Sequence, residues 1–205
     1  MDMNWYPMIE NERNFYKQFE DKVRFEKYCP SKIDYLFIGE SISRVEYPLT
    51  EKSEIYNFYI PDTLFSSFLQ TFRDVYKSEK VLGDKRFSFH LWSDFLELFK
   101  SNNCFLYDLC PIPVDHLKKE EQDLRKEICN FYEDDLTDFL QDEKPIYIFC
   151  CHESIDEIVQ RSITKSGISP KLYKCSKFPK NEKHKIIFKN DLSNFLIECN
   201  KDLGG

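Results

Sequence analysis

The segment from Lys165 to Lys189 carries the strongest chemical signal in the sequence. It holds eight lysines and one acid, Glu182, so its formal charge is +7. Tyr173, Phe178 and Phe188 are interleaved with the lysines. Cations that alternate with aromatic rings suit a phosphate backbone and its stacked bases. A solvated lysine face in a lysine-rich chain gives the same pattern, so both interpretations stay open at this point.

Four short apolar runs predict the strands that position such groups. They are rich in β-branched and aromatic side chains and cover residues 33–38, 104–109, 145–150 and 171–175. Helical periodicity lies between and after them, at residues 61–75, 91–99, 116–141, 153–164 and 191–200. This alternation predicts a single α/β domain over residues 1–205, with a parallel sheet covered on both faces and an N-terminal helical extension at 1–30.

Polar residues come directly after each predicted strand. In a parallel sheet covered by helices, ligands bind at the carboxyl ends of the strands. We therefore expect the functional site among four groups: Gly39-Glu40-Ser41, Asp108 to Pro113, His152, and Ser176 to His184. Cys150 and His152 lie too close together on one strand end to predict a nucleophile–base pair.

The composition excludes several classes of protein. Only Gly39, Gly83 and Gly167 lie inside the chain, too few for a Walker-type phosphate loop or a dinucleotide-binding loop. The eight cysteines include no C-x-x-C pair, which predicts reduced structural thiols and neither a metal site nor a cofactor. No apolar run approaches the roughly 18 residues of a membrane span, and the first ten residues lack a signal pattern. We therefore expect a cytoplasmic protein without membrane contact.

The net charge is distributed unevenly along the chain. The formal net charge is −7, and because residues 165–189 contribute +7, the other 180 residues carry −14. The basic segment leaves DNA, single- or double-stranded, open as a partner at one edge of the molecule. The acidic remainder suits docking to a protein partner with a basic surface.

Several motifs resemble those of the uracil-DNA glycosylase superfamily. The run L-F-I-G-E-S (Leu36 to Ser41) is followed about fifteen residues later by Asn57-Phe58-Tyr59, a pattern similar to the bacterial branch with an E-S-P-P first motif. Cys104 to Pro111 resembles the second strand of that family with its Pro-containing loop, and Ser176 to Leu196 resembles the late loop and final helix. The resemblance covers about residues 33–196. It implies a three-layer α/β/α sandwich with four parallel strands in the order 2-1-3-4.

The resemblance also implies an activity, the cleavage of the N-glycosidic bond of a base flipped out of DNA. In this reading Glu40 holds a water or stabilises the sugar cation, and Phe58, with Tyr59 as its rival, stacks on the base. Asp108 takes the position that reads the edge of the base, and His184 is the candidate proton donor. Structural interpretations stay open beside these roles, since Glu40 could accept hydrogen bonds from the backbone and Phe58 could be an ordinary core residue.

The remaining contacts implied by the resemblance lie around these residues. The segment from Lys177 to His184 takes the place of the loop that wedges the strand open. The expected substrate contacts are Gly39, Ser41 and Pro111, and the expected DNA contacts are Lys174, Lys177, Phe178, Lys180, Lys183 and Lys185.

The sequence departs from the family pattern at three places. An ionised Asp108 stands where an Asn is usual, and because it offers only acceptors it suits an exocyclic amino group better than a uracil carbonyl. Lys177-Phe178-Pro179 replaces a His-Pro-Ser motif, and Ile42-Ser43 replaces two prolines. Asp108 therefore favours an amino-bearing or modified base as the substrate, or else it is held protonated. The other two departures leave the activity itself open. They keep two alternatives open: a non-catalytic module that binds nucleic acid, nucleotide or protein, and a nucleoside hydrolase.

Overall fold

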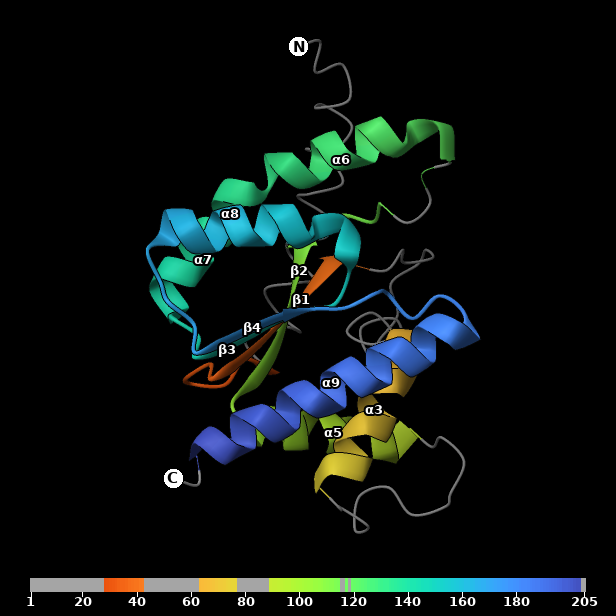
Figure 1. Ribbon diagram of the computed structural model, residues 1–205, viewed down its shortest axis with the longest axis vertical. Coiled ribbons are helices and arrows are strands. Elements are labelled where there is room, and N and C mark those ends of the chain that lie inside the picture. The colour runs from red at the N-terminus through yellow and green to blue at the C-terminus, as the bar shows by residue number, and fades with distance from the viewer. Residues whose placement is uncertain (1–27, 43–62, 77–88, 115–116, 118, 204–205) are drawn as a thin grey trace.

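A parallel sheet of four strands forms the centre of the structure (Figure 1). The computed structural model describes residues 28–42, 63–76, 89–114, 117 and 119–203. The strands are β1 (Tyr35–Ser41), β2 (Cys104–Cys110), β3 (Tyr147–Cys150) and β4 (Leu172–Cys175). They pair in parallel in the order β2-β1-β3-β4, which confirms the predicted order 2-1-3-4.

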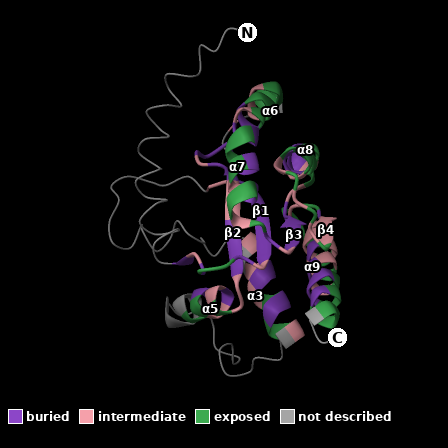
Figure 2. Ribbon diagram, turned by 90° about the vertical axis from the view of Figure 1, so that its left-hand side faces the viewer, coloured by how far each residue is buried: buried purple, intermediate pink, exposed green. Residues whose placement is uncertain are grey.

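Helices cover both faces of the sheet, as Figures 1 and 2 show. One layer consists of α6 (Gln122–Phe131), α7 (Glu133–Glu143) and α8 (Asp156–Ser166). The opposite layer consists of α3 (Thr63–Tyr76), α5 (Phe89–Ser101) and α9 (Glu182–Leu203). Short 3-10 turns at Lys119–Glu121 and Glu153–Ile155 lead into α6 and α8. The predicted three-layer α/β/α arrangement is therefore confirmed.

β1 is buried on both faces because it lies in the interior of the sheet, between β2 and β3, where helices cover both sides. Its side chains alternate between the two layers: Leu36 and Ile38 pack on the side of α6, α7 and α8, and Phe37 packs on the side of α3, α5 and α9. Many phenylalanines of this aromatic-rich chain pack on the side of α3, α5 and α9. There Phe37 contacts the rings of Phe68, Phe72, Phe99, Phe149 and Phe195.

The single helix predicted at residues 116–141 is wrong, because two helices, α6 and α7, occupy that region. They meet at Tyr132, whose backbone dihedrals (φ −91°, ψ 8°) are not helical. The side chain of Tyr132 is fully buried among the core residues of this layer. The bend therefore lets both helices place an apolar face on the same side of the sheet.

The last helix begins earlier than predicted, at Glu182 instead of residue 191. The side chain of Asn181 caps it, since Oδ1 of Asn181 accepts the backbone N–H of His184 at 2.9 Å. The wedge segment predicted at Lys177 to His184 is therefore part loop and part helix. Lys183 and Lys185 lie in the first turns of α9.

Some predictions fall on residues outside the described part of the chain. These are nearly all of the helical extension at 1–30, together with Phe58 and Tyr59. Among the helices that the structure describes, none combines the length and the apolar character needed to span a membrane.

The side chain of Asp108 occupies the space beside Gly39 where any other residue would carry its Cβ atom. The strand register pairs Gly39 of β1 with Asp108 of β2. A Cβ atom built on Gly39 would lie 2.1 Å from Oδ1 of Asp108, far closer than two non-bonded atoms can approach. Because glycine has no Cβ atom, it lets the side chain of Asp108 lie directly against β1.

This contact predicts a specific coupling between the two positions. Gly39→Ala should lower the free energy of unfolding by about 1–3 kcal/mol, as overpacking of a tight interior does. In the background of Asp108→Ala the same substitution should cost much less, because the carboxylate that it meets is gone. Urea unfolding of the two single variants and the double variant measures the coupling. Strictly additive costs would contradict the close approach.

Candidate active site at the carboxyl edge of the sheet

Glu40 is the centre of a polar cluster at the carboxyl end of β1. It exposes 7% of its side chain, and it lies on the same side of the strand as Leu36 and Ile38. Arg125 of α6 binds it with two nitrogens: Nε donates to Oε1 at 2.9 Å, and Nη2 donates to Oε2. The hydroxyl of Ser154, in the turn that leads into α8, donates to Oε1 at 3.0 Å. Three donors therefore hold one buried carboxylate.

These contacts keep Glu40 ionised. Burial alone would raise the pKa of its carboxyl, but the hydrogen bond from Arg125 and the charges of His152 and Arg125, with the bond from Ser154, lower the pKa below its usual value. The ionised carboxylate thus contributes stability above the pKa of the unfolded chain, about 4.3. That contribution is lost as the pH falls through the lower pKa of the folded state.

His152 faces Glu40 from the end of β3. Its Nε2 lies 3.7 Å from Oε2 of Glu40. Its Nδ1 accepts the backbone N–H of Ser154 at 3.1 Å and lies 2.7 Å from the Ser154 hydroxyl. Because Nδ1 accepts, the proton of the neutral imidazole is on Nε2, the nitrogen that faces Glu40.

The imidazole of His152 is held neutral at neutral pH. Burial lowers its pKa, and the nearby charges of Arg125 and Lys180 lower it further, although Glu40 and Glu153 act in the opposite direction. A neutral imidazole with a proton on Nε2 can donate a hydrogen bond to a developing anion. The cluster therefore combines an ionised carboxylate with a neutral proton-bearing ring.

The start of the segment predicted to contact DNA borders this cluster. The ring of Phe178 stacks on the ring of His152, with centroids 5.1 Å apart and an interplanar angle of 27°. Lys180 is close enough to influence the charge of His152. Nζ of Lys177 lies 3.6 Å from a carboxylate oxygen of Glu153. The loop after β4 therefore brings an aromatic ring and cations to the edge that carries Glu40.

The fold divides the basic segment of residues 165–189 between two edges of the sheet. Lys171 precedes β4, at the amino edge, where its backbone N–H binds the carbonyl of Ile146. Among the described residues, Lys180 and Lys183 are the lysines of the carboxyl edge that pair with no carboxylate. Five lysines of the segment pair with carboxylates: Lys165 with Glu133 and Asp134, Lys171 with Asp202, Lys174 with Asp191, Lys177 with Glu153, and Lys185 with Glu182.

Asp108 does not join Glu40, because the two side chains leave the sheet on opposite faces. Cys104 and Leu106, which share the face of Asp108 by strand alternation, pack in the layer of α3, α5 and α9. Asp108 also raises the pKa of Cys151, whose thiol lies in that layer and whose burial is the larger cause. The expected convergence of the two carboxylates is therefore not what the structure shows.

The other predicted site residues take separate places. Ser41 accepts the backbone N–H of Val114 at 3.4 Å and so ties the end of β1 to the segment after β2. Pro111 is half-buried in that same segment. His184 lies in the first turn of α9, and among the described residues no hydrogen bond or ion pair joins its side chain to Glu40, Arg125 or His152.

Two members of the cluster were missed in the sequence and one was only half identified. Arg125 and Ser154 lie 85 and 114 residues from Glu40 along the chain, and no motif spacing links them. The sequence pattern places His152 directly after a strand but gives it no role. A buried carboxylate requires a positively charged partner. The signal that could have pointed to Arg125 is therefore the prediction of a buried Glu40, which needs an arginine or lysine from another element.

Comparison with known proteins finds no family model that matches the chain and no curated protein similar to it.

The neutral His152 predicts a pH dependence of stability. Its pKa is lowered in the folded state, so as the pH falls below about 6.5 the unfolded chain binds a proton that the folded chain does not. The wild-type protein should therefore lose stability between about pH 6.5 and the lower pKa of the folded state. His152→Asn should reduce this loss, since Asn caps the Glu153–Ile155 turn equally well but does not titrate. Urea unfolding at pH 7.5 and 5.5 tests this, and equal pH dependence in both proteins would contradict it.

Proposed function

We propose that the chain is a DNA glycosylase-like enzyme, which cleaves the N-glycosidic bond of a flipped uracil-like or modified base. The observation that carries this proposal is the ionised carboxylate of Glu40, held at the carboxyl edge of the sheet beside a neutral His152. The resemblance of Leu36 to Ser41 to the first motif of the uracil-DNA glycosylase superfamily is consistent with the same role. The edge of a parallel sheet is where such folds bind their ligands.

In this mechanism the bond between the base and C1′ of the sugar breaks, and its electron pair leaves with the base. The sugar then carries positive charge, which the negative charge of Glu40 stabilises. Water adds to C1′, and the proton it loses neutralises the departed base directly or through solvent. His152, with its proton on Nε2, donates a hydrogen bond to the departing base and so replaces His184 in that role.

Arg125 has two effects on such a site. Its two hydrogen bonds keep the carboxylate ionised and fix its orientation, which favours electrostatic stabilisation of a cation. The same positive charge offsets part of the field that Glu40 exerts on the sugar. That offset favours a second candidate function, a non-catalytic module that binds nucleic acid at this edge.

The choice of base is left to experiment. The preference for an amino-bearing base depends on Asp108 reading the base in the site of Glu40, and Asp108 lies on the other face of the sheet. The substrates to compare are therefore DNA duplexes and single strands that contain uracil, hypoxanthine or a modified cytosine.

Glu40→Gln should reduce base release at least about 100-fold, because the neutral amide no longer stabilises the sugar cation. Glu133→Gln is the matched control. Glu133 is also buried and bound by two nitrogens of one arginine, Arg161, but its partners are on α8. Both variants should lose stability, since each leaves an arginine without its buried carboxylate partner. Only Glu40→Gln should lose base release at a temperature where both variants remain folded.

The same assay separates the two candidate functions. Release by wild type and by Glu133→Gln but not by Glu40→Gln supports the enzyme. DNA binding without release of any base selects the binding module. The absence of both DNA binding and base release would refute both candidate functions.

DNA affinity should depend on Lys180 and Lys183, the carboxyl-edge lysines without a carboxylate partner among the described residues. The slope of log K against log salt concentration is negative for DNA binding. Replacing both lysines with Ala should make this slope less steep, by about 1 per lysine. The control replaces Lys165 and Lys171, which have carboxylate partners, and it should leave the slope nearly unchanged. Fluorescence anisotropy over a range of salt concentrations measures both. Equal changes in the two double variants would argue against a DNA-binding carboxyl edge.

A further inference from the structure

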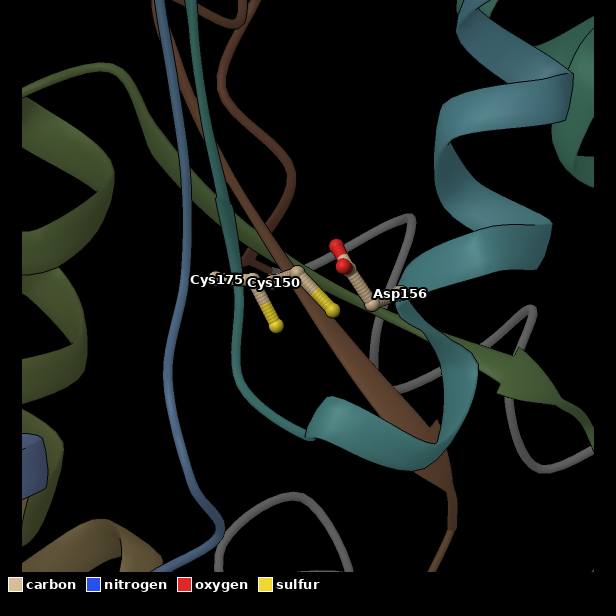
Figure 3. Close-up of side chains that lie close together, drawn as sticks. All are labelled: Cys150, Asp156 and Cys175. Carbon is tan, nitrogen blue, oxygen red and sulfur yellow. The ribbon is translucent and has the colours of Figure 1, made fainter.

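Two thiols and a carboxylate from three elements of the fold gather beside the candidate active site. Cys150 ends β3, Cys175 ends β4, and Asp156 is the first residue of α8. Figure 3 shows the three side chains close together. Their ligand atoms, the two Sγ atoms and one carboxylate oxygen, all lie within 4.8 Å of one another.

The strand register explains why the two thiols lie together. Cys150 and Cys175 are directly paired residues of parallel neighbouring strands, so their side chains leave the sheet on the same face. That face is covered by α8, whose first residue supplies Asp156. The adjacent thiol of Cys151 packs in the opposite layer.

We propose that Cys150, Cys175 and Asp156 bind one Zn²⁺ ion. Thiolate sulfur and carboxylate oxygen are both established zinc ligands in proteins. In a tetrahedral site with Zn–S bonds of about 2.3 Å, two sulfurs lie about 3.8 Å apart. Ligand atoms already within 4.8 Å of one another need only small side-chain movements to reach that geometry.

The surroundings of the three ligands also suit a metal ion. Cys150 is fully buried, whereas Cys175 and Asp156 are half-buried, so two of the three ligands keep some contact with solvent. The carboxylate of Asp156 is held by two neighbours: the hydroxyl of Tyr173 donates to Oδ1, and the side-chain amide of Gln160 donates to Oδ2 at 3.0 Å. Neighbours of this kind orient a metal ligand. Three protein ligands leave a fourth position for water.

The ion would stabilise the turn that carries the candidate active site. Asp156 follows Ser154 by two residues. A metal held by residues 150 and 156 would therefore clamp both ends of the segment that presents His152 and Ser154 to Glu40. The inference does not depend on glycosylase activity, because it rests on different side chains.

The test uses the full chain, purified under reducing conditions and stripped of metal with a chelator. Titration with Co²⁺ should give one bound equivalent, with a thiolate-to-cobalt absorption band in the near ultraviolet and the intense visible bands of a tetrahedral site. Added Zn²⁺ should displace the cobalt. Absence of the thiolate band would overturn the proposal.

Variants identify the ligands. Cys175→Ser and Asp156→Asn should each weaken Co²⁺ binding at least about ten-fold, since even the loss of a residue that only orients a ligand costs that much. Asp156 is half-buried, so Asp156→Asn is the variant to rely on if Cys150→Ser fails to fold. Cys151→Ser is the matched control, and it should bind Co²⁺ like wild type.

Two further outcomes would refute the site. Equal loss of Co²⁺ binding in Cys151→Ser and Cys175→Ser would show that the effect is general destabilisation. A disulfide between Cys150 and Cys175, detected by mass spectrometry in protein prepared under reducing conditions, would show that the pair serves redox chemistry instead. Base release can be measured separately on the same samples, so failure of the metal site and failure of the enzyme proposal remain distinguishable.

Discussion

The charge of Glu40 is the constraint around which the carboxyl edge of the sheet is built. A carboxylate at the end of a central strand is taken largely out of water, and it must find positive charge and hydrogen bonds within the protein. Arg125 meets this need from α6, and Ser154 meets it from the turn before α8. The ion pair ties a helix, and the hydrogen bond from Ser154 ties a turn, to the end of β1.

Stability alone does not explain why such a pair is present. Well-packed apolar residues of similar volume often replace a buried ion pair with no loss of stability. The residues of β1 from Tyr35 to Ile38 are buried and pack in the cores of the two layers. The placement of the charge at the one edge where parallel sheets bind ligands is therefore the stronger reason to assign it a function.

Strand alternation decides which residues can work with Glu40. Side chains that leave β1 and β2 on the face of α6, α7 and α8 can approach it, and Asp108 on the other face cannot. The chemistry of the edge is thus drawn from α6, from the turn after β3 and from the loop after β4. The same turn lies between Cys150 and Asp156, so the candidate active site and the proposed metal site share one short segment of backbone.

The sequence by itself determined the features that depend on neighbours along the chain. Apolar runs and helical periodicity predicted the α/β class and all four strands, because hydrophobic patterning over a few residues is a local property. The resemblance to a known family implied the strand order. The ends of the helices were harder to predict from the sequence. The bend at Tyr132 depends on burying that ring, which only the packed core decides. The cap at Asn181 starts α9 nine residues before the predicted position.

The tertiary structure alone decided how the side chains pair across elements. The partner of Glu40 lies 85 residues away, Asp108 is separated from it by the sheet itself, and five of the lysines in the basic segment are paired with carboxylates. Cys150 and Cys175 meet because β3 and β4 adopt one register. Register and helix orientation are set by packing of the whole core, so the spacing of residues along the chain could not reveal which of them touch.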